Sequence, residues 1–317
     1  MKDQAPAPAN ALKFTDPALT AKGEPRATVS LTNPQTLWFN TGTLCNIECA
    51  NCYIESSPRN DRLVYITTED VSDYLDQLET RKWGVHEIGF TGGEPFMNPQ
   101  MIDMADRCLQ RGYAVLILTN AMRPMMRRSV RDRLENLHAR FGTRLTLRIS
   151  VDHHSAELHD TERGKGTFER TLEGMRWLRD IGMQMAVAGR TVWGETDAEA
   201  RAGYAALFAR EGFEIDAANP VQTMLFPEMD TTVEVPEITT ACWGILGKSP
   251  SEVMCASSRM VVKRKGAARP SVLACTLLPY DPEFELGKTL EEAEQPVALN
   301  HPHCAKFCVL GGASCSA

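Results

Sequence analysis

The sequence predicts an α/β fold, an open barrel of parallel strands followed by a small irregular module rich in cysteine. Three observations favour it. Short β-rich runs alternate with helical stretches from residue 34 to about residue 225, an order that implies right-handed parallel crossovers. One of these runs carries polar residues along one face, which is unusual for a strand covered by helices on both sides. Beyond about residue 225 the alternation stops, and Pro and Cys become frequent.

The strands and helices follow each other in a regular order. The β-rich runs cover residues 36–40, 86–90, 113–119, 144–151, 183–189 and 213–218. The helical stretches cover about residues 68–83, 99–111, 127–140, 167–181 and 196–211. Thr67 and Asp70 predict a capping box at the start of the first helix. Gly112, Gly182 and Gly212 stand where helices commonly end.

The run at 144–151 favours a barrel over a flat sheet. Apolar and polar residues alternate along it and just past its end: Leu145, Leu147, Ile149 and Val151 against Thr146, Arg148, Ser150 and Asp152. A doubly wound sheet would bury both faces of this strand and make it apolar throughout. A polar inner face instead favours an open barrel whose lumen holds a ligand. An edge strand with one wet face is the alternative.

Composition narrows the functional classes. The chain has 317 residues and a net charge of −7, which disfavours binding to the nucleic-acid backbone. We find no apolar stretch of about eighteen residues, as a membrane span requires, and no signal-peptide core near the start. We therefore expect a cytoplasmic protein without a membrane anchor. Disulfides are rare in that compartment, so a tight group among the ten cysteines indicates metal binding or catalysis.

Three cysteines follow the first predicted strand closely. Cys45, Cys49 and Cys52 have the spacing C-x-x-x-C-x-x-C. Structural zinc takes four closed ligands, whereas the nearest downstream histidine here is His86. A [4Fe–4S] cluster held by three cysteines leaves one iron open to a ligand from outside the protein. The triplet therefore favours a chemically active cluster, with a zinc loop as the alternative.

The triplet resembles the cluster motif of the radical S-adenosylmethionine (SAM) superfamily. "TGGEP" at 91–95 is similar to the GGE motif of that family, and residues 150–174 resemble its stretch from the fourth strand into the following helix. The resemblance implies a partial (β/α)6 TIM-like barrel, a [4Fe–4S] cluster and bound SAM. It also implies cleavage of SAM to a 5′-deoxyadenosyl radical that abstracts hydrogen from the substrate. The family's usual aromatic or large apolar residue before the third cysteine is Asn51 here, with Tyr53 after it.

The resemblance also implies which residues bind SAM. They are Gly92, Gly93, Glu94, Asn120, Ser150, Asp152, Arg163 and Arg190. Glu94 would accept from the SAM ammonium, and Arg163 would lie near the SAM carboxylate. The pair His153–His154 is a candidate for substrate contact or acid–base chemistry, although loop polarity also explains it. No catalytic residue of the chain itself is identified.

Six cysteines lie after residue 225 and resemble the SPASM and twitch extensions of radical SAM enzymes. They are Cys242, Cys255, Cys275, Cys304, Cys308 and Cys315. We expect one auxiliary [4Fe–4S] cluster on Cys255, Cys275, Cys304 and Cys308. Cys315 could replace one of the last two, and His301 or His303 could also substitute. Zinc or scattered buried thiols are the alternative. Cys242 and Cys108 are expected to pack in the core.

These expectations divide the chain into an arm at 1–33, a radical SAM barrel at 34–225 and an auxiliary cluster module at 226–317. The predicted function is a radical SAM oxidoreductase acting on a small molecule or short peptide. Its auxiliary cluster would bind substrate or accept an electron, and its electron donor would be a protein such as flavodoxin or ferredoxin. One alternative is a maturase of a ribosomally made peptide delivered by a partner, because the arm is too short for a peptide-recognition domain. Others are an iron–sulfur electron carrier and a zinc-binding adaptor.

Overall fold

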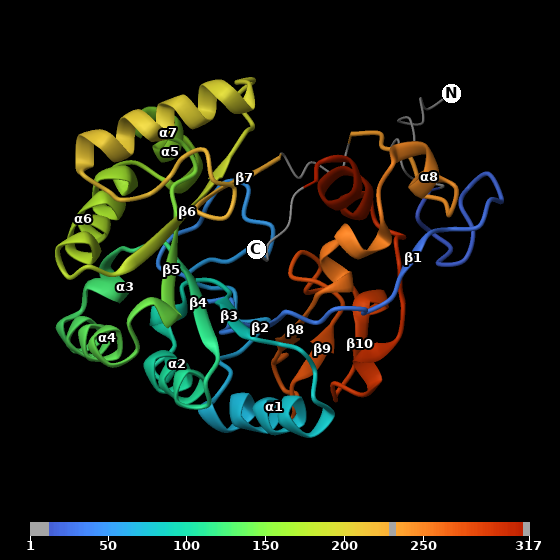
Figure 1. Cartoon of the computed structure of the whole chain (residues 1–317), viewed down its shortest axis with the longest axis horizontal. Coiled ribbons are helices and arrows are strands. Elements are labelled where there is room, and N and C mark those ends of the chain that lie inside the picture. Colours follow the sequence, from blue (N-terminus) through green and yellow to red (C-terminus); the bar gives the residue numbers. More distant parts are fainter. Residues whose placement is uncertain (1–12, 228–232, 313–317) are drawn as a thin grey trace, which may run out of the picture.

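The computed structural model describes residues 13–227 and 233–312. Its centre is a nine-stranded sheet in the order β10-β9-β8-β2-β3-β4-β5-β6-β7 (Figure 1). Six parallel strands form the partial barrel: β2 (Thr36–Asn40), β3 (Glu87–Thr91), β4 (Ala114–Thr119), β5 (Leu145–Ser150), β6 (Gln184–Arg190) and β7 (Thr223–Phe226). The predicted α/β class and open barrel are confirmed.

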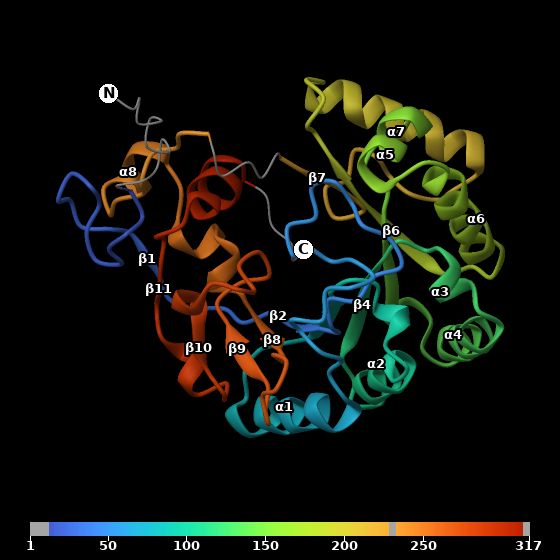
Figure 2. The ribbon, with the colours of Figure 1, turned by 180° about the vertical axis from the view of Figure 1, so that it is seen from behind.

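Helices cover the outer side of the curved sheet, as Figures 1 and 2 show from opposite sides. All five predicted helices are present: α1 (Thr68–Arg81), α2 (Met101–Gln110), α4 (Arg128–Phe141), α6 (Thr167–Asp180) and α7 (Asp197–Glu211). In the barrel region, two short helices were not predicted, α3 (Arg123–Met126) and α5 (Ala156–Arg163). Cys108 is buried on α2, as its helical spacing predicted.

The predicted helix boundaries have the expected local chemistry. The Asp70 backbone N–H donates to Thr67 Oγ1 at 3.1 Å, and the Thr67 N–H donates to Asp70 Oδ2 at 3.0 Å. This reciprocal pair is the capping box predicted for α1. Gly212 ends α7 in the left-handed conformation, with φ of 67°. Side chains rarely adopt that region, which is why glycine serves there.

The sixth strand lies later in the chain than predicted. Residues 213–218 form no strand, although Phe213, Ile215 and Ala217 are buried in alternation. Asp216 Oδ1 accepts from the Ala218 N–H at 2.8 Å, and the next turn follows at Asn219. These side-chain turns bend the backbone before it can pair. Pairing with β6 therefore begins only at β7, and the prediction of a strand at 213–218 was wrong.

Strands from the C-terminal part extend the barrel sheet. β8 (Ser258–Val262) pairs in parallel with β2, and β9 (Ser271–Leu273) and β10 (Glu285–Gly287) follow antiparallel. A separate ladder joins β1 (Thr28–Val29) to β11 (Val297–Ala298). This part also contains α8 (Cys242–Leu246), a π-helix at Cys304–Leu310 and several one-turn 3-10 helices. The predicted division near residues 33 and 225 stays a prediction.

The apolar and polar side chains of β5 point to opposite faces of the sheet, as the alternation predicted. Leu145, Leu147 and Ile149 are fully buried in the apolar core, whereas Ser150 and, just after the strand, Asp152 line a cavity inside the barrel. Arg148 is also buried. The polar face therefore belongs to the lumen of an open barrel. Among the described residues, no helix has the length and apolar character needed to cross a membrane.

Candidate active site

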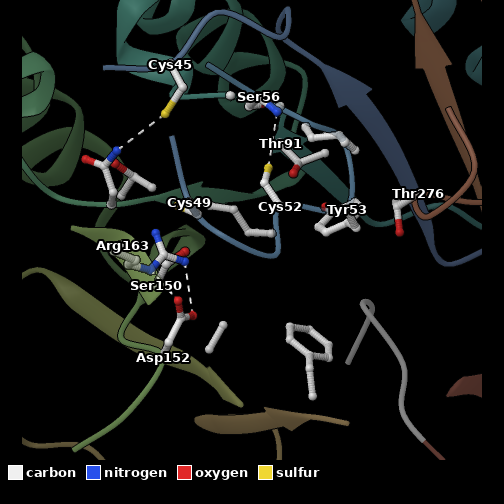
Figure 3. A pocket seen from close by; sticks show the side chains of 18 of the residues that line it. Cys45, Cys49, Cys52, Tyr53, Ser56, Thr91, Ser150, Asp152, Arg163 and Thr276 are labelled. Atoms are coloured by element: carbon white, nitrogen blue, oxygen red, sulfur yellow. Dashed lines mark hydrogen bonds and ion pairs between the residues drawn. The ribbon is translucent and has the colours of Figure 1, made fainter. Parts of the chain in front are cut away.

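A cavity of about 130 Å³ lies at the carboxyl ends of the barrel strands (Figure 3). Its polar lining includes Cys45, Cys49, Cys52, Gly92, Gly93, Asn120, Ser150, Asp152, Arg163 and Arg190. These are all the residues predicted for the first cluster and SAM except Glu94. Apolar side chains, among them Trp38, Tyr53 and Phe226, complete the wall. The fold thus brings together residues that lie far apart in the sequence, at the end where barrels carry their sites.

The cysteine loop follows β2 and faces this cavity with three thiols. None of the nine described cysteines forms a disulfide. The Ser56 N–H donates to Cys52 Sγ at 3.2 Å, and Asn120 Nδ2 lies 3.9 Å from Cys45 Sγ. Burial raises the pKa of Cys45 to about 12 and that of Cys49 to about 11. Without metal the Cys45 and Cys49 thiols are therefore protonated at neutral pH, and binding of iron to them must release protons.

The two glycines of the GGE motif make room for the cysteine loop. A Cβ atom on Gly93 would lie 2.2 Å from the Leu44 carbonyl oxygen, and one on Gly92 would lie 2.6 Å from the Gly42 carbonyl oxygen. Gly92 also has a φ of 140°. The Gly93 N–H donates to the Gly42 carbonyl at 2.8 Å. Glycine is thus required because two backbone segments touch here, in addition to any approach of a ligand.

Glu94 does not line the cavity and lies buried beside its wall. Its carboxylate accepts from Thr119 Oγ1 at 2.8 Å, from the Asn120 N–H at 2.9 Å and from the Phe96 N–H at 3.2 Å. Burial raises the pKa of Glu94 to about 6, although these hydrogen bonds oppose the rise. In this geometry Glu94 fixes the end of β4. Its predicted role toward the SAM ammonium stays a prediction.

An ion pair stands across the cavity from the cysteines (Figure 3). Arg163, at the end of α5, donates from Nε and Nη2 to the two carboxylate oxygens of Asp152, at 2.6 and 3.1 Å. Burial alone raises the pKa of Asp152, but Arg163 and Arg190 outweigh it, so the net shift is downward. The carboxylate is therefore charged at neutral pH, and it holds the Arg163 guanidinium in a fixed plane.

Glu162 is a functional candidate that the sequence did not suggest. Its Oε1 accepts from the Asn51 N–H at 2.9 Å and its Oε2 accepts from Asn51 Nδ2 at 2.8 Å. Arg190 Nη2 donates to the Asn51 carbonyl at 2.9 Å. Asn51, the departure from the family pattern, is thus bound on its backbone and its side chain. No spacing rule links residue 51 to residue 162, because only the fold brings them together.

The His153–His154 pair lies beside the cavity and does not line it. His153 Nε2 and His154 Nε2 lie 2.8 and 3.2 Å from the carboxylate of Glu195. The Ser155 N–H donates to His153 Nδ1 at 2.9 Å, so the proton of the neutral ring is on Nε2 and points at Glu195. Three potential metal ligands meet here, and in this structure His153 Nε2 lies against the Glu195 carboxylate. The group ties two loops together.

A second, smaller cavity of about 20 Å³ lies in the C-terminal part. Four of the predicted auxiliary ligands line it, Cys255, Cys275, Cys304 and Cys308, together with His303. Burial raises the pKa of Cys255 to about 11, and that of Cys304 well above its usual range. Of the other candidates, Cys315 lies outside the described residues, and neither His301 nor Cys242 lines this cavity. Cys242 packs partly buried against the core.

The two cavities share a wall. Leu277 lines both of them, and Thr276 lines the first. Tyr280 reaches the cysteine loop, where its hydroxyl donates to the Ile54 carbonyl at 2.9 Å and Arg62 stacks on its ring at 3.5 Å. The segment that begins at Cys275 therefore runs from one cysteine group to the other.

Comparisons with known proteins agree on one family. A family model described as the Radical SAM superfamily matches residues 39–202, just over half of the chain. The chain is 32% identical over 145 residues to the antilisterial bacteriocin subtilosin biosynthesis protein AlbA of Bacillus subtilis, a match that covers 45% of this chain and 30% of that protein. It is 30% identical over 158 residues to the AdoMet-dependent heme synthase of Methanosarcina barkeri, covering 48% and 41% of the two proteins.

The fold also resembles solved structures. SuiB of Streptococcus suis, bound to its precursor peptide SuiA, superimposes with a TM-score of 0.56 at 13% identity, over 84% of this chain and 66% of that chain. At this identity the likeness concerns the fold alone. The matches with the curated relatives cover less than half of those proteins' length.

Proposed function

Because the chain belongs to the radical SAM superfamily, whose members use SAM and a [4Fe–4S] cluster, we propose that Cys45, Cys49 and Cys52 hold that cluster and that the adjoining cavity holds SAM. One observation carries the proposal: the three thiols line the same cavity as the Asp152–Arg163 ion pair. Three soft ligands on one loop suit an iron–sulfur cluster with an open iron. A pure electron carrier would need neither the ion pair nor a polar lumen.

The residues of the cavity have separable roles in this proposal. When bound, the cluster and SAM supply a 5′-deoxyadenosyl radical that takes a hydrogen atom from the substrate. Arg163 uses Nε and Nη2 on Asp152, which leaves Nη1 for a ligand carboxylate. Apolar residues such as Tyr53 and Phe226 exclude water from the reacting groups. Asn120 and Ser150, at the ends of β4 and β5, offer hydrogen bonds to the sugar of a nucleoside.

A peptide is the substrate that we propose first. The named relatives include a bacteriocin biosynthesis protein, and a solved structure of similar fold contains a precursor peptide. A small molecule is the second candidate, because another relative is a heme synthase. The cavity suits either, since it combines an apolar wall with two arginines and a carboxylate. A cytoplasmic location and an electron donor such as flavodoxin or ferredoxin stay predictions.

We further propose one auxiliary [4Fe–4S] cluster, as in a twitch-like extension, on Cys255, Cys275, Cys304 and Cys308. All four line the second cavity, and Leu277 belongs to the walls of both cavities. The auxiliary cluster would therefore stand beside the substrate. This position supports a role in accepting an electron from the substrate after hydrogen abstraction.

Anaerobic reconstitution tests both clusters. The wild type is compared with a Cys45→Ala/Cys49→Ala/Cys52→Ala variant and a Cys255→Ala/Cys275→Ala variant, with iron, sulfide and 5′-deoxyadenosine measured after addition of SAM and dithionite. We expect about eight irons in the wild type and about four in each variant. The first variant should form no nucleoside, whereas the second should still form it. Iron without SAM cleavage would favour the electron carrier, and zinc in place of iron would overturn the proposal.

A further inference from the structure

We propose that Glu162 and Asn51 form a clamp that positions the cysteine loop for its cluster, an inference that rests on the proposed function only for what the loop holds. Asn51 lies between Cys49 and Cys52. No helix or strand forms between the end of β2 and the start of α1 among the described residues, apart from isolated bridges. The loop is held partly by bonds within it, such as that from the Cys45 N–H to the Ser57 carbonyl at 3.1 Å, whereas Ala50 and Asn51 are bonded to residues outside it.

The clamp is built from several hydrogen bonds at one end of α5. Both carboxylate oxygens of Glu162 accept from Asn51, one from its backbone and one from its amide, at 2.9 and 2.8 Å. The Glu162 carbonyl accepts from the Ala50 N–H at 2.8 Å. The side chain of Glu162 is 4% exposed. Because a buried carboxylate without donors is costly, these bonds fix the loop strongly in one position.

Arg190 completes the arrangement from β6. It donates to the Asn51 carbonyl, and its guanidinium lies 3.6 Å from both Glu162 and Asp152. Arg190 thus balances the charge of Glu162 and holds the opposite edge of Asn51. The clamp joins the cysteine loop to two barrel elements, and α5 also carries Arg163. The short helix α5 therefore fixes the position of the cysteine loop relative to the Asp152–Arg163 ion pair.

Exchanging the carboxylate and the amide between residues 162 and 51 distinguishes a hydrogen-bonded clamp from ordinary packing. In Glu162→Gln, the charged acceptor is lost, and Asn51 can bond the new amide only by turning its own side-chain amide over. In Asn51→Asp, two carboxylates face each other. In the double variant Asn51→Asp/Glu162→Gln, the new amide donates to the new carboxylate and its oxygen still accepts from the backbone N–H. The double variant therefore restores the pattern with donor and acceptor exchanged. Glu157→Gln, at an exposed position of the same helix, is the matched control.

Amide hydrogen exchange across residues 45–56 of the metal-free protein tests the clamp directly. Exchange at residue 51 should become about tenfold faster in each single variant, because a hydrogen bond to a charged group is lost. It should return to within about twofold of the wild-type rate in the double variant and stay unchanged in Glu157→Gln. Wild-type exchange in Glu162→Gln, or no recovery in the double variant, would overturn the proposal.

Cluster retention connects the clamp to the proposed function. After reconstitution, iron loss to a chelator should be about tenfold faster or more in the single variants, as for groups that orient metal ligands. The double variant should recover. If the single variants keep their cluster as well as the wild type does, the clamp does not position it and the proposal fails. If the wild type takes up no cluster, the proposed function fails, while the exchange rates still decide whether the clamp exists.

Discussion

At the scale of single residues, the turn after β3 has no space for a side chain. Gly93 leaves no space for a Cβ atom, because the Leu44 carbonyl oxygen would lie 2.2 Å from it. We expect Gly93→Ala to lower the free energy of unfolding by about 1–3 kcal/mol, as other overpacked sites do. Urea unfolding measures this. Gly244→Ala is the control, because no atom of the described residues lies within 4 Å of its added Cβ. Equal stability of the two variants would contradict the close approach.

Glu94, in the same turn, makes the stability of the protein depend on pH. Its folded pKa of about 6 lies above the ordinary value. The folded state therefore binds the proton more tightly than the unfolded state, and the contribution of Glu94 to stability falls as pH rises from about 4.5 to about 6. A shift of this size corresponds to about 2 kcal/mol.

The comparison with Glu94→Gln isolates this effect. The difference in free energy of unfolding between wild type and variant should change by about 2 kcal/mol between pH 4 and pH 7, in favour of the variant at the higher pH. Urea titrations at several pH values measure it. Glu157→Gln should show no such change. A difference that is independent of pH would mean that Glu94 has an ordinary pKa.

At the scale of elements, α1 depends on its capping box. Thr67 and Asp70 each satisfy a backbone N–H of the other, and Lys263, just after β8, pairs with Asp70 at 2.8 Å. We expect Thr67→Ala to destabilise the protein by about 1 kcal/mol, whereas Thr67→Ser keeps the acceptor and should cost little. Thermal unfolding distinguishes the two variants. Similar losses in both would point to the methyl group of Thr67 rather than to the cap.

Elements that follow local patterns could be predicted from the sequence, and elements that depend on distant contacts could not. Periodicity and capping residues located the helices and most of the barrel strands, and the cysteine spacing located the loop that lines the cavity. The strand at 213–218 failed because side-chain turns at Asp216 and Asn219 bend the backbone. The contact between Glu162 and Asn51 has no local signature, because two side chains more than a hundred residues apart form it.

At the scale of the whole molecule, a buried ion pair helps to tie the N-terminal segment to the C-terminal part, beside backbone bonds such as that from the Ala27 N–H to the Ile238 carbonyl at 2.8 Å. Arg26 Nη2 lies 2.6 Å from Glu237 Oε1, and the two side chains are 0% and 6% exposed. Glu237 also accepts from the Phe14 and Ala21 N–H groups. We expect Glu237→Ala to cost about 3–5 kcal/mol, because it leaves Arg26 as an uncompensated buried charge.

Guanidinium unfolding measures this cost. Glu234→Ala, which removes the partner of Lys13 in an exposed pair, is the matched control and should change stability little. Limited proteolysis should also cut near residues 13–26 faster in Glu237→Ala than in the control. Equal behaviour of the two variants would mean that the remaining contacts of the segment, among them the β1–β11 ladder and the Ala27–Ile238 hydrogen bond, hold it without this ion pair.

The parallel pairing of β8 with β2 has a consequence for any attempt to shorten the protein. A fragment ending at residue 225 would lose β8, β9 and β10 and would leave the backbone groups along one side of β2 without partners. Such an open strand edge is a template for adding a further strand, from another copy or from a misfolded chain. The C-terminal strands therefore protect the edge of the barrel sheet, independently of the cysteines beside them. We expect the barrel without them to aggregate.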